Sequence, residues 1–387
     1  MPEQTLGGEE LAALIERVFR PRPDERAMGV MIDLPDARVG DEPAWRARRE
    51  MAAGWVAALA PFERELGLEV HLLLYRNAHM NNADLPPAAW LHPGGPLPAR
   101  AEDLDPAAAI PFAEIFAAHP ILMAPTHFSA TAPLKLAARE QAIRAATMPG
   151  FSPAMVPALR LDYGVIHARC DHLKALLDRA EAAEIRFLSD AERRCELTLD
   201  LRHRSATASG GLFPEPGKAG NLPSGETYIV PYEGEREGDP SRSAGELPVQ
   251  FGDELVFYRV EQNKAIEARG EGGAAREEAA RLVAEPAYGN LAELGLGVLA
   301  DFGIEPSGEI LLDEKLGLHI AFGRSDHFGG QVGAAQFSSP DAVVHIDRVY
   351  IPRIQPRVAV ERADLVMGGG ERLALMRDNV YAIDFPA

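Results

Sequence analysis

Cysteine is scarce in this chain, since only Cys170 and Cys195 occur among its 387 residues. Two cysteines cannot frame a disulfide scaffold in a chain of this length, so a secreted, disulfide-stabilised protein is not expected. Neither thiol lies in a C-x-x-C pattern, and we do not expect either one to act as a nucleophile.

Basic charge and long apolar runs are also lacking. The chain has 39 Lys and Arg against 58 Asp and Glu, which gives a formal net charge of −19. Phosphate backbones and anionic lipids would repel such a chain, so neither nucleic acid nor a membrane is expected as a partner. No run of roughly eighteen apolar residues occurs, and residues 1–10 lack the features of a secretory signal. We therefore expect a cytoplasmic protein.

The first half of the chain alternates between helix-like and strand-like patterns. Apolar residues recur at helical spacing in some segments and form short continuous runs in others. Helices are expected over residues 9–19, 45–65, 133–146 and 172–182, and buried strands over residues 29–33, 69–75 and 121–125. This alternation favours a parallel α/β sheet. The chain has neither a G-x-G-x-x-G nor a Walker A motif, so a nucleotide site is not indicated.

After about residue 185 short strand patterns separated by Gly and Pro turns dominate. Among the expected strands are residues 226–230, 310–312 and 318–322, and residues 233–246 are expected to form a surface loop. A chain of 387 residues suits two domains. We expect an N-terminal parallel α/β domain at 1–200 and a mixed, β-rich α+β domain that binds metal at 201–387.

Acids and imidazoles are concentrated in Gly-punctuated apolar segments of this second half. A charged group in an apolar run is costly unless it is paired or bound to a cation. Taken singly, each Glu is more often an exposed acid and a lone His is more often a satisfied core residue. Taken together, a bound cation is the simplest explanation. The candidate ligands are Glu226, Glu293, Glu314, His319, His345 and Asp347.

His345 and Asp347 give the clearest local pattern, because residues two apart on a strand point to the same face. Imidazole and carboxylate together suit Zn, Mn, Co or Fe. Six such ligands without cysteine could hold two divalent ions that share a bridging carboxylate. Two such ions hold a hydroxide nucleophile and polarise a carbonyl or phosphoryl group, and a Glu that is not fully used as a ligand could shuttle a proton.

The same segments resemble those of a known family, the thermophilic metallo-aminopeptidases of the aminopeptidase T and aminopeptidase S type, which are leucyl aminopeptidase-like. The strings that carry the resemblance are G-N-L-P-S-G-E at 220–226, N-L-A-E-L-G-L-G at 290–297, E-K-L-G-L-H-I-A-F-G at 314–323 and V-H-I-D at 344–347. A further match is A-T-M-P-G at 146–150. The resemblance covers the chain from about residue 120 onward.

The resemblance implies a hydrolase that releases N-terminal residues from short peptides through a metal-bridging hydroxide, with two divalent ions (Zn, Mn or Co) and a homodimer. It implies that Glu226, Glu293, His319, His345 and Asp347 bind metal, with Glu293 as the bridge. It makes Glu314 a ligand or general base. The family commonly has a Tyr a few residues beyond His319 that stabilises an oxyanion. Here His327 is the candidate for that role.

Two alternatives remain open. A distant branch of the same superfamily cleaves hydroxylated pyridine rings with one non-haem iron, dioxygen and a two-His, one-carboxylate site. Here His319 or His327 with His345 and Asp347 could bind Fe(II). That branch has His at the position of Glu293, so the hydrolytic, two-metal site is favoured. The second alternative is a non-catalytic homologue that uses the cleft for binding.

Overall fold

The computed structural model of the chain describes residues 5–190 and 192–386 and shows two compact units. No helix within these described ranges has the length and apolar character needed to cross a membrane. The first unit contains the residues up to Ile166 and Gly211–Ser224, and the second contains His167–Gly210 and the residues from Gly225 onward.

The domain border predicted at residue 200 lies inside the second unit, within its first segment, His167–Gly210. This segment contains strands β7 (Ala180–Ser189) and β8 (Arg194–Asp200), which pair with each other in the largest sheet of the second unit. The change in sequence pattern near residue 185 marks this sheet, whereas the chain enters the unit earlier, within helix α7 (Tyr163–Leu177).

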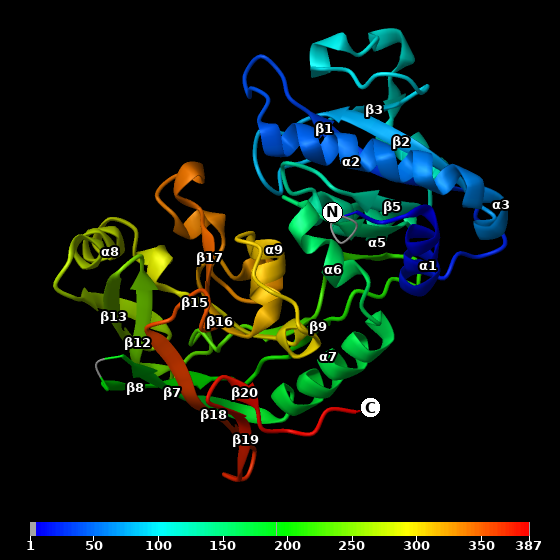
Figure 1. The fold of residues 1–387 in the computed structure, drawn as a ribbon. Coiled ribbons are helices and arrows are strands. Elements are labelled where there is room, and N and C mark those ends of the chain that lie inside the picture. The colour runs from blue at the N-terminus through cyan, green and yellow to red at the C-terminus, as the bar shows by residue number, and fades with distance from the viewer. Residues whose placement is uncertain (1–4, 191, 387) are drawn as a thin grey trace. The chain divides into compact units, whose positions relative to one another are not determined.

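The first unit is built on a seven-stranded sheet with the order β10-β6-β5-β1-β2-β3-β4 (Figure 1). Its strands are β1 (Ala27–Leu34), β2 (Glu69–Arg76), β3 (Ala88–Leu91), β4 (Ile110–Pro111), β5 (Ile121–Ala124), β6 (Arg144–Thr147) and β10 (Lys218–Asn221). Its helices are α1 (Gly8–Phe19), α2 (Pro43–Leu59), α3 (Glu63–Leu66), α4 (Phe112–Ala118), α5 (Thr131–Gln141) and α6 (Val156–Leu159).

The parallel α/β prediction for the first unit is confirmed. β1, β2, β5, β6 and β10 pair in parallel, and β3 and β4 add an antiparallel edge. All eight residues of β1 are buried, as expected of a central strand that helices cover. The helix predicted over residues 133–146 is wrong at its end. Ala142 adopts a left-handed conformation (φ 57°) that stops α5, and the next residues form the buried strand β6.

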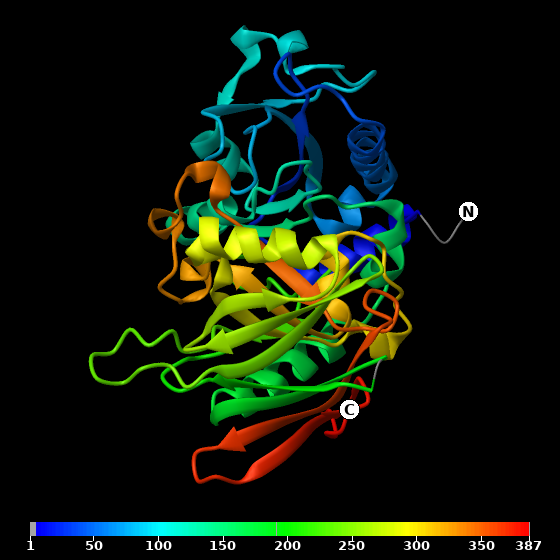
Figure 2. The same ribbon diagram turned by 90° about the vertical axis from the view of Figure 1, so that its left-hand side faces the viewer.

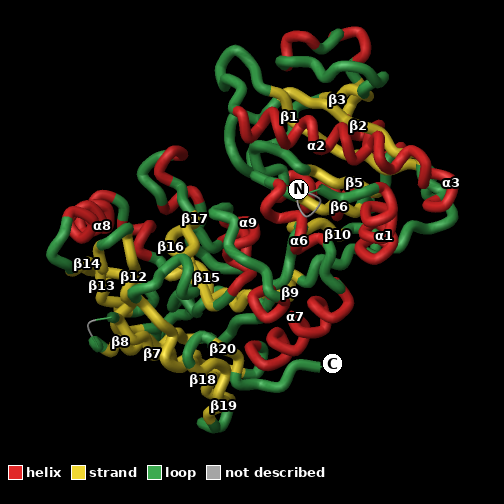
Figure 3. The backbone as a smooth tube through the Cα atoms, in the orientation of Figure 1, coloured by secondary structure: helices red, strands yellow, loops and turns green. Residues whose placement is uncertain are grey.

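The second unit contains two antiparallel sheets, shown from different sides in Figures 2 and 3. The smaller has five strands in the order β17-β16-β15-β11-β9, and the larger has eight in the order β14-β13-β12-β8-β7-β18-β19-β20. The remaining bounds are β9 (Thr207–Ser209), β11 (Glu226–Ile229), β12 (Ala244–Phe251), β13 (Glu254–Glu261), β14 (Lys264–Arg269), α8 (Gly273–Ala284), β15 (Leu291–Gly297), α9 (Ile310–Asp313), β16 (Leu318–Gly323), β17 (His345–Val349), β18 (Val358–Met367), β19 (Arg372–Arg377) and β20 (Val380–Tyr381).

Aromatic side chains join the two sheets of this unit. The ring of Tyr258 on β13 lies 5.0 Å from that of Phe322 on β16, and both side chains are fully buried. Helix α8 packs on β13 and β14 (Figure 2). The strand predicted over residues 310–312 is wrong, because these residues begin the short helix α9. The side chain of Asp313 accepts hydrogen bonds from the amides of Ser307 and Gly308 and so closes this turn.

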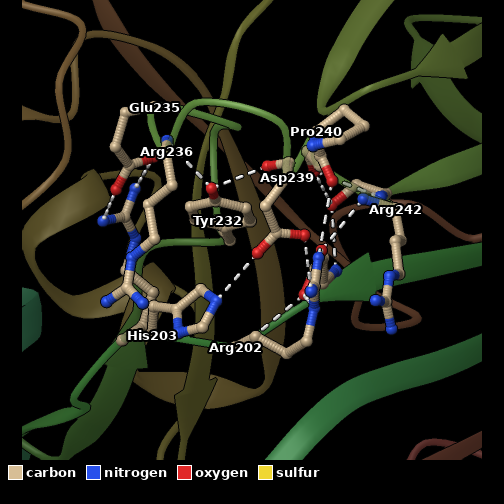
Figure 4. Close-up of polar contacts among 12 residues, drawn as sticks. Arg202, His203, Tyr232, Glu235, Arg236, Asp239, Pro240 and Arg242 are labelled. Carbon is tan, nitrogen blue, oxygen red and sulfur yellow. Dashed lines mark hydrogen bonds and ion pairs between the residues drawn. The ribbon is translucent and has the colours of Figure 1, made fainter.

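The loop predicted over residues 233–246 is tied to the body of the unit by the polar cluster in Figure 4. The Tyr232 hydroxyl donates to the carbonyl of Asp239 at 2.7 Å, and Arg202 donates to the Asp239 carboxylate at 2.8 Å. The carboxylate of Glu233 accepts hydrogen bonds from Asn290 at 2.8 Å and from Ser325 at 2.6 Å. The loop therefore supports the residue that precedes β15 and the turn that follows β16.

Candidate metal centre

Four adjacent strands of the five-stranded sheet bring five of the six predicted ligands to one face. Directly opposite residues in paired strands share a face, as do residues two apart along a strand. The register places His319 opposite Gly295, and both Asp347 and Glu293 opposite Ala321. The ligands on this face are Glu226 on β11, Glu293 on β15, His319 on β16, and His345 and Asp347 on β17.

Small residues between the ligands make room for them. A Cβ atom on Gly295 would lie 1.9 Å from Nε2 of His319, a distance that no real side chain tolerates. Gly323 lies opposite His345 and has a φ of 101°, in the region that glycine occupies most readily. The Gly-punctuated apolar strings are thus strands whose glycines border the imidazoles.

The side chains form two overlapping groups of three. In the first, Nε2 of His319 lies 3.2 Å from Oε1 of Glu293 and 3.5 Å from Oε2 of Glu226. In the second, Nε2 of His345 lies 3.4 Å from Oε2 of Glu293 and 3.5 Å from Oδ1 of Asp347. Within each group the possible ligand atoms all lie within 4.8 Å of one another. Glu293 belongs to both groups, and each of its oxygens faces a different histidine.

Each histidine is oriented by its other ring nitrogen. Nδ1 of His319 lies 3.2 Å from the carbonyl oxygen of Gly317, and Nδ1 of His345 lies 2.8 Å from that of Arg324. A carbonyl oxygen only accepts, so Nδ1 donates and Nε2 is left for the carboxylates or for a metal ion. Backbone bonds of this kind typically fix the tautomer of metal-binding histidines.

The arrangement fits divalent metal ions. Nitrogen and oxygen donors without sulfur suit Zn, Mn, Co or Fe. The side chains of Glu226, Glu293 and His319 are 8%, 4% and 0% exposed. Oε2 of Glu226 is buried and has no hydrogen-bond partner among the described residues. Because a buried carboxylate oxygen without a hydrogen bond is costly and its ion pair with His319 is long, at 3.5 Å, this atom indicates the place of a cation.

In the ion-free protein these carboxylates favour protonated imidazoles. Burial alone would lower the pKa of His319, but the carboxylates of Glu293, Glu226 and Asp347 outweigh it and raise this pKa to about 9. The pKa of His345 is likewise raised, by Asp347 and Glu293 against the effect of burial. Conversely, although burial opposes its ionisation, the two histidines hold the pKa of the Glu293 carboxyl well below its usual range.

These shifts predict how the stability of the ion-free protein depends on pH. A raised pKa of His319 stabilises the folded chain fully below about pH 6.5, and this stabilisation is lost as the pH rises through about 9. The expected loss is on the order of 3 kcal/mol. Thermal unfolding with a chelator should therefore show a lower midpoint at pH 9 than at pH 6.5, with a smaller difference after metal loading. Equal midpoints in the chelated protein would contradict this prediction.

Glu314 lies in neither group of three. It belongs to a single turn before β16, and its carboxylate contacts the Nζ atom of Lys315. Burial raises the pKa of Glu314 to about 8, against the opposing effect of the Lys315 ammonium. The sequence analysis predicts Glu314 as a ligand or general base, whereas the structure places it in contact with Lys315 and in neither group of three among the described residues.

His327 lies beside the second group. Its ring is 5.3 Å from that of His345 and 3.9 Å from that of Phe328. Burial, with a further contribution from His345, lowers the pKa of His327 to about 4, so its imidazole is neutral at pH 7.

The sequence reasoning missed Lys315 as a residue of the site. Its side chain is fully buried, and Nζ donates to Oε1 of Glu226 at 2.6 Å. The sequence does contain a signal for Lys315. Burying a lysine between Glu314 and an apolar strand costs as much free energy as burying an acid there.

Comparisons with known proteins identify the fold. No protein-family model matches the chain, and no curated protein sequence matches it. A 2,5-dihydroxypyridine dioxygenase from Pseudomonas putida is similar in structure, with a TM-score of 0.61 and 13% sequence identity over 98% of this chain and 99% of the other. AmpT, an aminopeptidase T from Thermus thermophilus, is also similar, with a TM-score of 0.54 and 17% identity over 99% of both chains.

Both structural neighbours are named as enzymes, and they have different activities. At these identities the likeness shows the fold and leaves the reaction to the residues of the site. The chain therefore has the two-unit α/β fold that a dioxygenase and an aminopeptidase share.

Proposed function

We propose that this chain is a metallo-aminopeptidase that removes N-terminal residues from short peptides and uses two divalent ions, Zn, Mn or Co. One observation carries the proposal: the two oxygens of Glu293 face different histidines, 3.2 and 3.4 Å away. A carboxylate so placed is suited to bridge two ions, which is the arrangement of dinuclear hydrolytic sites. A homodimer is the proposed assembly.

Bound ions of this kind polarise a carbonyl group and lower the pKa of water. The proposed ligands are Glu226 and His319 for one ion, His345 and Asp347 for the other, and Glu293 for both. The pKa of Glu314 is about 8, so this carboxyl carries a proton at neutral pH that it could give to the departing amine. The neutral ring of His327 can donate an N–H to the carbonyl oxygen as charge develops there.

The second candidate is a mononuclear iron dioxygenase. The fold of the Pseudomonas enzyme supports this candidate as much as the fold of AmpT supports a peptidase. Such chemistry uses two histidines and one carboxylate. Within the described part of the chain, neither group of three contains two histidines, and both contain Glu293. This donor set favours the hydrolase.

Metal loading and assay separate these candidates. The ion-free protein should bind two Zn, Mn or Co ions per chain at saturating supply, as measured by elemental analysis. The loaded protein should then release amino acids from a library of short peptides. One Fe(II) per chain with oxygen consumption on a hydroxylated pyridine would support the dioxygenase. Two bound ions without turnover of any peptide would support a non-catalytic homologue.

A further inference from the structure

Lys315 places a buried ammonium in this site. Its side chain is 0% exposed, and it lies in the turn Glu314–Leu316 that leads into β16. A lysine is almost never fully buried unless it is paired, and this one pairs with the carboxylates of Glu226 and Glu314. The main chain at Lys315 packs closely on β15, because a Cβ on Gly297 would lie 2.2 Å from its carbonyl carbon. The Lys315 side chain is therefore fixed at both ends, by the packing of its main chain and by the ion pairs of its ammonium.

The ammonium contacts only one of the two groups within the described residues. It binds Oε1 of Glu226 at 2.6 Å, while Oε2 of the same carboxylate faces Nε2 of His319 at 3.5 Å. Glu226 can thus offer one oxygen to an ion. For Glu293, His345 and Asp347 the structure shows no hydrogen bond or ion pair to Lys315 among the described residues.

We propose that Lys315 makes the two halves of the metal site unequal. The half formed by Glu293, His345 and Asp347 binds the first ion tightly. The half formed by Glu226, Glu293 and His319 binds the second ion about 100-fold more weakly, because the ammonium shares its carboxylate and repels a second cation. Lys315 is a positioning residue, and the inference rests on the proposed two-ion site.

Calorimetric titration of the ion-free protein with Mn²⁺ tests this inference. The wild type should bind in two steps, with dissociation constants about 100-fold apart. Electron paramagnetic resonance should show an isolated Mn²⁺ ion at one equivalent and a coupled pair only when the second step is filled. Lys315→Gln should reduce the ratio of the two dissociation constants by at least about tenfold. Lys315→Arg keeps the positive charge and should preserve this ratio.

Two further variants keep the test decisive. Lys315→Gln leaves the carboxylate of Glu226 without its ammonium partner and risks misfolding. Glu314→Gln combined with Lys315→Gln replaces both members of the Glu314–Lys315 contact by neutral amides, and it should reduce the ratio of the two dissociation constants as well. Lys264→Gln, which changes an exposed lysine of the same unit, should leave both steps unchanged. The inference would be overturned if the wild type bound both ions with equal affinity, or if the ratio of the two dissociation constants were unchanged in the double variant. Failure of the protein to bind any ion would instead refute the proposed function.

Discussion

Glu293→Gln is expected to lower peptide turnover by at least about a thousandfold. The amide retains the shape of the side chain but loses the charge that faces His319 at 3.2 Å and His345 at 3.4 Å. Because both groups of three contain Glu293, this single change should weaken binding of both ions. Steady-state assays of the metal-loaded variant and calorimetric titration of its ion-free form measure the two effects.

Glu278→Gln is the matched control for this variant. Glu278 is also a buried acid of the second unit, at 7% exposure, and it accepts hydrogen bonds from the hydroxyls of Tyr258 and Tyr288. A glutamine can keep those bonds, so turnover and metal affinity should remain close to the wild type. If the two variants bound metal equally well and turned over peptide equally fast, Glu293 would not be the shared ligand.

Gly295→Ala should remove the first group of three while leaving the sheet in place. The added methyl group would overlap the imidazole of His319, because the ideal Cβ lies 1.9 Å from Nε2. The ring must rotate away, which separates it from Glu293 and Glu226. We expect the ion of this group to bind at least about 100-fold more weakly and the protein to lose about 1–3 kcal/mol of stability from overpacking.

Gly273→Ala provides the comparison for this substitution. A Cβ on Gly273 meets its nearest neighbours only at ordinary contact distances, 3.8 Å and beyond. This variant should therefore bind both ions like the wild type, as titration with Mn²⁺ would show. If Gly295→Ala also bound both ions normally, His319 would not require its present position in order to act as a ligand.

Much of the fold follows from local patterns. The helix at Gly8–Phe19 and the buried strand at Glu69–Arg76 were predicted because their apolar spacing differs clearly. The helix predicted over residues 133–146 is wrong at its end. The short apolar run at β6 has no periodicity that distinguishes a helix from a strand. The strand predicted over residues 310–312 is wrong for the same reason, because Ile310–Asp313 form a short helix. Its helical form depends on the hydrogen bonds that Asp313 accepts.

The sequence predicted a shared cluster of acids and imidazoles but could not give the pairing of its side chains. The cost of burying charge makes Glu226, Glu293 and His319 candidate ligands, and the structure brings their possible ligand atoms within 4.8 Å of one another. The sequence could not show that Lys315 takes one oxygen of Glu226, because this contact joins residues 89 positions apart.

The alternation of side chains along the ligand-bearing strands limits which changes of chain length this protein can tolerate. Adding or deleting one residue within β11, β15, β16 or β17 would turn the residues beyond it to the opposite side of the sheet. Insertions and deletions should therefore accumulate outside these strands and outside the segments that carry site residues, for example at residues 334–342 in the connection between β16 and β17. Descendants of this chain can diverge widely in side chains while the lengths of these four strands stay constant.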